Sequence, residues 1–144
     1  MSNVLYAFNV SQMRKPFTDP MWDEWKRLVP QVHDEAEAHA GFVARHHGEH
    51  YDLGYITPYP HTPLIMGNLS QWRSKDDLFD FTFSGTHKEL MLRRTEWFEP
   101  WPPGLPVVAM WWAPPGKCCI RTARNKLRQL QMKGCSNAVF TWKS

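Results

Sequence analysis

Residues 4–10 read VLYAFNV, a run of β-branched and aromatic residues that is apolar on both faces except at Asn9. A run of this kind predicts a strand that is buried on both sides of its sheet. Three comparable runs later in the chain predict further strands, and a short final strand is expected near the C-terminal end. These runs cover residues 42–47, 64–72, 107–112 and 138–142.

Helix signals separate these strands. Asp19 followed by Pro20 is typical of a helix start, because Asp accepts from the first free amides and Pro fits the first helical position. Apolar residues then recur at three- and four-residue steps until Gly41 ends the pattern. Pro30 lies inside this pattern, and we expect a kink there because proline removes a backbone donor.

Further helix signals follow the third strand. Ser74 predicts the start of one helix, and Thr86 with Glu89 forms a capping box for the next, which is expected to extend to Phe98. The apolar spacing over residues 120–130 predicts an amphipathic helix near the C-terminal end.

This order of elements predicts one domain of the α+β class over residues 1–144. The expected arrangement is the ferredoxin-like split β-α-β, an antiparallel sheet with helices on one face, here with an extra C-terminal helix. Helices on one face leave the second face of the sheet open, although the strands are apolar on both faces. A second copy of the sheet would cover it, so we expect a homodimer packed sheet to sheet.

Composition excludes several classes of protein. The 144-residue chain has no apolar run near the roughly 18 residues that cross a bilayer, and residues 1–6 lack the pattern of a secretory signal. Its three cysteines, two of them adjacent at Cys118 and Cys119, form no even disulfide framework and suit a reducing compartment. We therefore expect a cytoplasmic protein without a membrane partner.

Basic residues gather near the C-terminal end. Residues 117–144 hold seven basic side chains and no acidic one, yet the whole chain has a net charge of only +3. Nucleic-acid binding usually needs more positive charge together with positioned aromatic contacts. We interpret this segment as a solvated helix face and expect no nucleic-acid partner.

Several motifs resemble a known family of uncharacterised domains. The resemblance is carried by Asn68-x-Ser70-x-Trp72-x-Ser74, by the run from His87 through Glu96-Trp97-Phe98, and by Trp111-Trp112-x-Pro114. Phe8-Asn9-Val10 and Phe140-Thr141 extend it over nearly the whole chain, while Pro30 and the adjacent cysteines depart from it. The family belongs to the dimeric α+β barrel superfamily, beside the antibiotic-biosynthesis monooxygenases and the haem-degrading monooxygenases.

This resemblance implies the fold and the dimer more strongly than any activity, since fold alone does not fix function. In the superfamily that this chain resembles, oxygenases attack electron-rich phenolic or quinol substrates without a metal. Haem-degrading members use an Asn, a Trp and an axial His, and other members isomerise, cyclise or lyse small molecules.

Two asparagines are candidate substrate ligands. Asn9 interrupts an apolar strand, and a buried amide without partners costs about 1–3 kcal/mol. The period of two in the third strand places Met66, Asn68, Ser70 and Trp72 on one face, and polar groups between apolar or aromatic neighbours are what a ligand-binding sheet face offers. Alternatively, Asn9 bonds to backbone at its strand end, and Asn68 and Ser70 bond across a dimer contact.

His87 is the candidate proton carrier. In the first turn of its helix the dipole disfavours imidazolium, and the neutral ring that results can accept a proton or ligate haem iron. The alternative is a surface histidine without a function.

Aromatic side chains are the candidate walls of a pocket. Aromatic residues make up 14% of the chain, with eight tryptophans, which indicates either a very aromatic core or a pocket lined by rings. Trp111 and Trp112 must point to opposite faces of their strand, so one of them can line a cavity. With these two we assign Trp72, Phe83 and Trp97 to substrate binding; core packing is the alternative.

The string His46-x-x-Glu49-His50 superficially matches a zinc-protease motif. That chemistry requires a helix, whereas this string follows a predicted strand and contains Gly48. In extended chain His46 and His50 would lie about 13 Å apart, too far to share one zinc ion. We predict no metal site.

We therefore expect an enzyme that acts without a cofactor on a hydrophobic aromatic or polyketide-like molecule, by oxygenation, cyclisation or isomerisation. His87 would move a proton while Asn9 and Asn68 hold substrate oxygens. One alternative is a haem-binding protein or haem monooxygenase with His87 as the axial ligand. Another is a non-catalytic ligand-binding or stress-related dimer.

Overall fold

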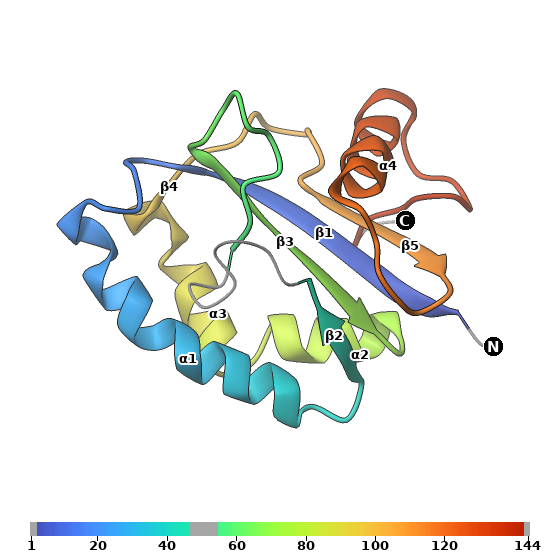
Figure 1. The fold of residues 1–144 in the computed structure, drawn as a ribbon, viewed down its shortest axis with the longest axis horizontal. Coiled ribbons are helices and arrows are strands. Elements are labelled where there is room, and N and C mark those ends of the chain that lie inside the picture. Colours follow the sequence, from blue (N-terminus) through green and yellow to red (C-terminus); the bar gives the residue numbers. More distant parts are fainter. Residues whose placement is uncertain (1–2, 47–54, 143–144) are drawn as a thin grey trace.

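The computed structural model describes residues 3–46 and 55–142, and strand β1 (Val4–Met13) lies at its centre (Figure 1). The strand belongs to an antiparallel five-stranded sheet and pairs along one edge with β3 and along the other with β4 and β5, while β2 pairs with β3. The remaining strands are β2 (Phe42–Arg45), β3 (Ile65–Trp72), β4 (Phe98–Glu99) and β5 (Val108–Ala113). The predicted antiparallel α+β sheet is confirmed, and β4 is an additional strand.

The helices follow the predicted order. They are the 3-10 turn η1 (Pro20–Trp22), α1 (Asp23–Ala38), α2 (Lys75–Thr82), α3 (Gly85–Leu92), the 3-10 turn η3 (Arg94–Glu96) and α4 (Ile120–Lys133). Asp19 Oδ1 accepts from the Met21 amide at 2.9 Å, and Ser74 Oγ accepts from the Asp77 amide at 3.1 Å, so both predicted start signals act as caps. Helix α1 continues through Pro30 to its end. Across residues 3–46 and 55–142, every helix is too short or too polar to span a membrane.

Helix α3 begins and ends elsewhere than predicted. Its N-cap is Ser84, and Thr86, the predicted cap, lies in the first turn. There the Thr86 amide and hydroxyl both donate to the Glu35 carboxylate of α1 instead of forming the predicted capping box. The helix does not extend to Phe98, because Phe98 belongs to β4 and pairs with β1.

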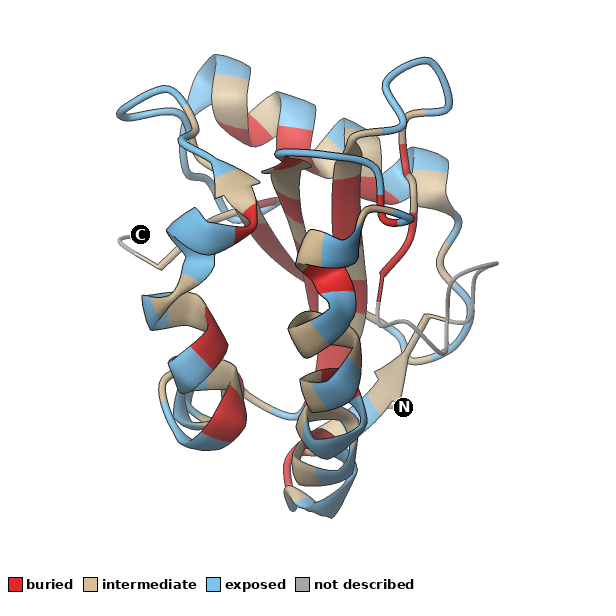
Figure 2. Cartoon of the chain, turned by 90° about the vertical axis from the view of Figure 1, so that its left-hand side faces the viewer, coloured by how far each residue is buried: buried red, intermediate tan, exposed pale blue. Residues whose placement is uncertain are grey.

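Both faces of the sheet are covered by helices. On one face, Leu5 and Ala7 of β1 pack in a cluster with residues of α1 and α2, namely Ala36 and Leu78. On the opposite face, the β1 residues Tyr6, Phe8 and Val10 pack against the α4 residues Ala123, Leu127 and Leu130. Figure 1 shows α4 on the other side of the sheet from α1, and Figure 2 shows that buried residues concentrate on the central strands and on the helix sides turned toward them.

Helix α4 is the extra C-terminal helix of the prediction, and its position changes the argument for a dimer. A sheet-to-sheet homodimer is expected where one face of the sheet lacks a cover. Because α4 packs on that second face, the open face no longer supports the dimer. The homodimer stays a prediction.

The segment after α4 returns to the sheet. A single β-bridge joins Phe140 to Met110 of β5, with N–H···O distances of 2.8 and 2.9 Å, in place of the longer predicted strand. Lys75 Nζ of α2 donates to the carbonyls of Thr141 and Trp142 at 3.3 Å each. These contacts bring Trp142 beside Phe83 at the end of α2, with ring centroids 5.5 Å apart.

Leu127→Ala tests whether α4 is a structural layer of the domain. The side chain is 1% exposed and packs on the sheet, so its truncation should lower the free energy of unfolding by about 2–5 kcal/mol. Met132→Ala on the same helix is the control, because Met132 is 69% exposed and should change stability by less than about 0.5 kcal/mol. Urea denaturation followed by circular dichroism measures both, and equal losses would contradict the packing.

Candidate functional site

A cavity of about 420 Å³ lies between the sheet and helices α1, α2 and α3. Its volume falls within the range of roughly 300–1,000 Å³ that small-molecule sites occupy. Its wall is mainly apolar and aromatic. Six of the nine predicted site residues line it, namely Asn9, Asn68, Ser70, Trp72, Phe83 and His87.

The floor of the cavity comes from the pattern of β1. On the face toward α1 this strand carries Ala7, Asn9 and Ser11, which are small or polar and fill less space than Tyr6, Phe8 and Val10 on the other face. Asn9 stands directly opposite Asn68 in the β1–β3 register. Among the described residues neither side-chain amide has a hydrogen-bond partner, so both remain available to a ligand.

Ser70 and Trp72 extend the same face of β3. The Trp72 indole N–H donates to Ser70 Oγ at 2.9 Å, which uses the hydroxyl to hold the ring. Phe42 and Phe81 pack on this indole, with centroids 5.3 and 5.1 Å away. Trp72 therefore forms a fixed aromatic end of the cavity.

His87 has a defined tautomer. Its Nδ1 lies 2.9 Å from the carbonyl oxygen of Thr82, and since a carbonyl only accepts, Nδ1 carries the proton. Burial lowers the pKa of His87, against smaller opposing effects of the Thr82 bond and the Glu35 charge, so the ring is neutral near pH 7. Nε2 is then a lone-pair acceptor, and within the described part of the chain it has no hydrogen-bond partner.

Three predicted wall residues lie elsewhere. Trp97 is buried in the cluster beneath η1 and α1, and Trp111 stacks on Tyr6 on the α4 face, with centroids 5.6 Å apart. Trp112 is 45% exposed at the far end of β5. The structure therefore does not bring Trp97, Trp111 and Trp112 to the cavity.

Three other tryptophans take their place. Trp25 of α1, Trp101 after β4 and Trp142 near the C-terminal end all line the cavity. The indole nitrogens of Trp25 and Trp101 are buried and have no acceptor among the residues described. Trp25 begins the series of apolar residues at three- and four-residue steps along α1, whereas Trp101 lies in a proline-rich connector that has no periodicity.

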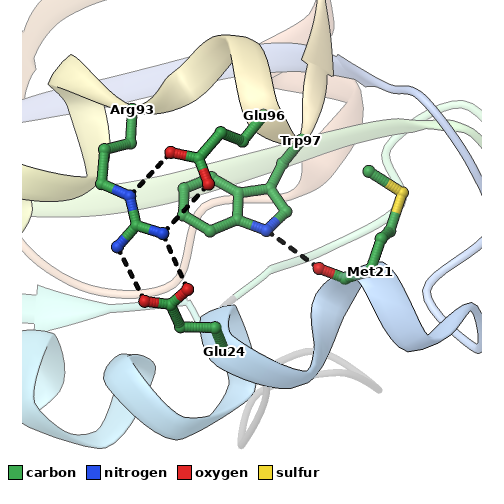
Figure 3. Close-up of polar contacts among 5 residues, drawn as sticks. All are labelled: Met21, Glu24, Arg93, Glu96 and Trp97. Carbon is green, nitrogen blue, oxygen red and sulfur yellow. Dashed lines mark hydrogen bonds and ion pairs between the residues drawn. The ribbon is translucent and has the colours of Figure 1, made fainter.

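An ion-pair cluster fixes the start of α1 to the segment after α3 (Figure 3). Arg93 donates to both Glu24 oxygens, at 2.9 and 2.7 Å, and to Glu96 at 2.7 Å, and these bonds lower the pKa of both carboxyls. Its guanidinium lies 4.9 Å from the Trp97 ring, whose N–H donates to the Met21 carbonyl at 3.1 Å. Arg93 thus holds Glu24 of α1 and Glu96 of η3 together.

The structure describes only part of the zinc-like string. His46 is described, but Glu49 and His50 lie outside the described residues. Within residues 3–46 and 55–142, no group of three or more His, Cys, Asp or Glu side chains could hold a metal ion.

His87→Asn should change how stability depends on pH. The pKa of His87 is depressed in the folded chain, so the unfolded chain binds this proton first as the pH falls below about 6.5. Stability is therefore lost from about pH 6.5 down to the folded pKa, at up to about 1.4 kcal/mol per pH unit. The substituted amide could still donate to the Thr82 carbonyl but does not titrate, so this variant should lose less stability between about pH 7 and pH 5.5.

Urea denaturation at several pH values measures the effect. His61→Asn is the matched control, because His61 is exposed and lies outside the cavity wall. Identical pH slopes for wild type and His87→Asn would show that His87 titrates normally in the folded chain.

Several solved structures are similar to this chain in fold. The chain is similar to a conserved protein from Methanosarcina mazei, at 15% identity, covering 80% of this chain and 95% of that one with a TM-score of 0.53. It is also similar to a putative antibiotic biosynthesis monooxygenase from Nitrosomonas europaea, at 8% identity. That match covers 80% of this chain and 92% of the other, with a TM-score of 0.52. A protein of unknown function from the same organism is similar at 12% identity, over 82% of this chain and 96% of the other, with a TM-score of 0.54.

At these identities the similarity shows the fold alone, and it confirms the predicted ferredoxin-like architecture. No curated protein matches the sequence. The family model described as a domain of unknown function, DUF3291, matches residues 4–144. The predicted membership of an uncharacterised family is thereby confirmed, and the chain belongs to the DUF3291 family.

Proposed function

We propose that this protein is an enzyme that acts without a cofactor on a small hydrophobic molecule, aromatic or polyketide-like, bound in the cavity between sheet and helices. The observation that carries the proposal is His87, a neutral imidazole that lines the cavity with Nε2 unbonded among the described residues. A general base needs this protonation state and an available lone pair. The similarity to a putative antibiotic biosynthesis monooxygenase supports the choice of reaction class.

The wall supports the choice of substrate class. Trp25, Trp72 and Trp101 offer flat apolar surfaces, and sites with such walls favour planar ligands. Asn9 and Asn68 supply amide donors and acceptors at the middle of the floor. A ligand with ring oxygens would satisfy these groups, whereas a pure hydrocarbon would leave them unpaired at about 1–3 kcal/mol each.

The proposed chemistry begins with proton transfer. His87 Nε2 takes a proton from a substrate hydroxyl or from a carbon next to a carbonyl, and the Asn9 and Asn68 amides stabilise the oxyanion that develops. In an isomerisation or cyclisation the proton returns to another atom of the product. In an oxygenation a ring methylene and dioxygen give a ring carbonyl and water.

The assembly and location belong to the same proposal. A cytoplasmic homodimer fits the family resemblance and the unpaired cysteines of the described structure, Cys118, Cys119 and Cys135. No membrane or nucleic-acid partner is proposed.

His87→Ala tests the proposed base. With a panel of hydroxylated two- to four-ring aromatics, wild type should bind at least one ligand by calorimetry and convert it, with products identified by mass. His87→Ala should lose about 10²–10⁴-fold in kcat/KM while ligand affinity changes little, because a base acts in the transition state. His61→Ala, the same change at an exposed site outside the cavity wall, should retain full activity.

An oxygen electrode separates the reaction types, since only oxygenation consumes dioxygen in step with product. Full turnover in His87→Ala would remove His87 from the chemistry. Binding without conversion of any ligand would favour a non-catalytic ligand-binding dimer.

The same unbonded Nε2 favours one alternative, a haem-binding protein with His87 as the axial ligand. Arg94, also in the cavity wall, could pair with a haem propionate. Under this alternative, haemin titration should give a Soret band that saturates at about one haem per chain and is lost in His87→Ala. A featureless spectrum that does not saturate would exclude it.

A further inference from the structure

Glu35 of α1 accepts two hydrogen bonds from Thr86 in the first turn of α3. One oxygen of its carboxylate accepts from the Thr86 amide at 2.9 Å, and the other accepts from the Thr86 hydroxyl. These bonds lower the pKa of Glu35, so the group is ionised at neutral pH. Thr86 is buried, and a buried polar group needs such partners.

The first turn of α3 depends on this carboxylate. Ser84, the N-cap, makes no side-chain capping bond to the helix, and its hydroxyl instead donates to the Asp80 carbonyl. Gly85 has a φ of +57°, and a Cβ at this position would overlap a Glu35 oxygen. The chain therefore passes close over the carboxylate with a residue that has no side chain, and Glu35 takes the place of the missing cap.

His87 follows Thr86 directly. Its ring is held from α2 by the Thr82 carbonyl and by Phe81, whose ring centroid lies 5.1 Å away, while its backbone belongs to the turn that Glu35 holds. We propose that Glu35 is the positioning residue for His87, fixing the turn of α3 that presents the imidazole to the cavity and stabilising the imidazolium that forms when the ring accepts a proton. This inference rests on the proposed role of His87, although its test needs no substrate.

The charged groups around His87 determine in which direction the loss of the Glu35 charge should move the His87 pKa. Glu35 is the charged group that acts on the ring from α1, and its negative charge raises the pKa of His87 against the larger effect of burial. From α2 the contacts are neutral, through Thr82 and Phe81. Besides His87 itself, the ionisable residues of the cavity wall are His33, Arg45, Arg94 and Glu99.

NMR titration of the His87 ring, with amide hydrogen exchange in α3, tests the proposal. Glu35→Gln can keep both bonds to Thr86 but loses the charge, so its α3 amides should exchange as in wild type while the His87 pKa falls below the wild-type value. Glu35→Ala loses both bonds, and the Thr86 amide should exchange about tenfold faster or more. Its His87 ring should also no longer show a single Nδ1–H form.

Glu89→Gln is the matched control, since it removes the same charge from an exposed position on α3 itself and should leave the His87 pKa unchanged. The proposal is overturned if Glu35→Gln leaves the His87 pKa unchanged, or if Glu89→Gln lowers it equally. It is also overturned if Glu35→Ala speeds exchange but keeps the wild-type His87 signals, because Glu35 would then be only structural. Turnover that survives in His87→Ala would refute the proposed function and leave these NMR results intact.

Discussion

Strand β1 is hydrogen-bonded along both edges, and this pairing constrains the rest of the domain. A strand in this position has no edge to expose, so each of its side chains must face one helical layer or the other. Large residues on one face, Tyr6 and Phe8 among them, pack against α4. Small and polar residues on the other face, Ala7 and Asn9 among them, leave space beneath α1, and that difference creates the cavity.

Two carboxylates of α1 then fix the wall above that space. Glu24 binds Arg93 after the end of α3, and Glu35 binds Thr86 at its start. The two acids are eleven residues apart, about 16 Å along a helix. Because α3 is held at both ends, the position of His87 in its first turn is set by contacts that lie outside α3.

Local patterns in the sequence predict the elements well and the site in part. Period-two spacing correctly places Asn68, Ser70 and Trp72 on one face of β3, and Asp19 and Ser74 mark real caps, because these signals depend on neighbouring residues. The cap of α3 could not be found in this way, since Glu35 lies 51 positions from Thr86 in the chain.

The same limit explains the tryptophans. Alternation shows that Trp111 and Trp112 face opposite ways but not which face carries a cavity, and the packing of α4 on the sheet decides that. An amphipathic helix reveals that it has an apolar side without revealing the surface it will cover. For this reason the sequence could not show that α4 covers the second face of the sheet. Only the structure shows this, and it removes the open face from which the dimer is predicted.

The composition of the cavity wall has an optical consequence. Of the eight tryptophans in the chain, Trp25, Trp72, Trp101 and Trp142 border the cavity, whereas Trp112 is open to solvent. Indole emission depends on the polarity and the contacts of the ring, so displacement of water by a ligand alters four emitters together. Under the proposed function, the protein thus carries an intrinsic fluorescent reporter of ligand binding, which needs no label.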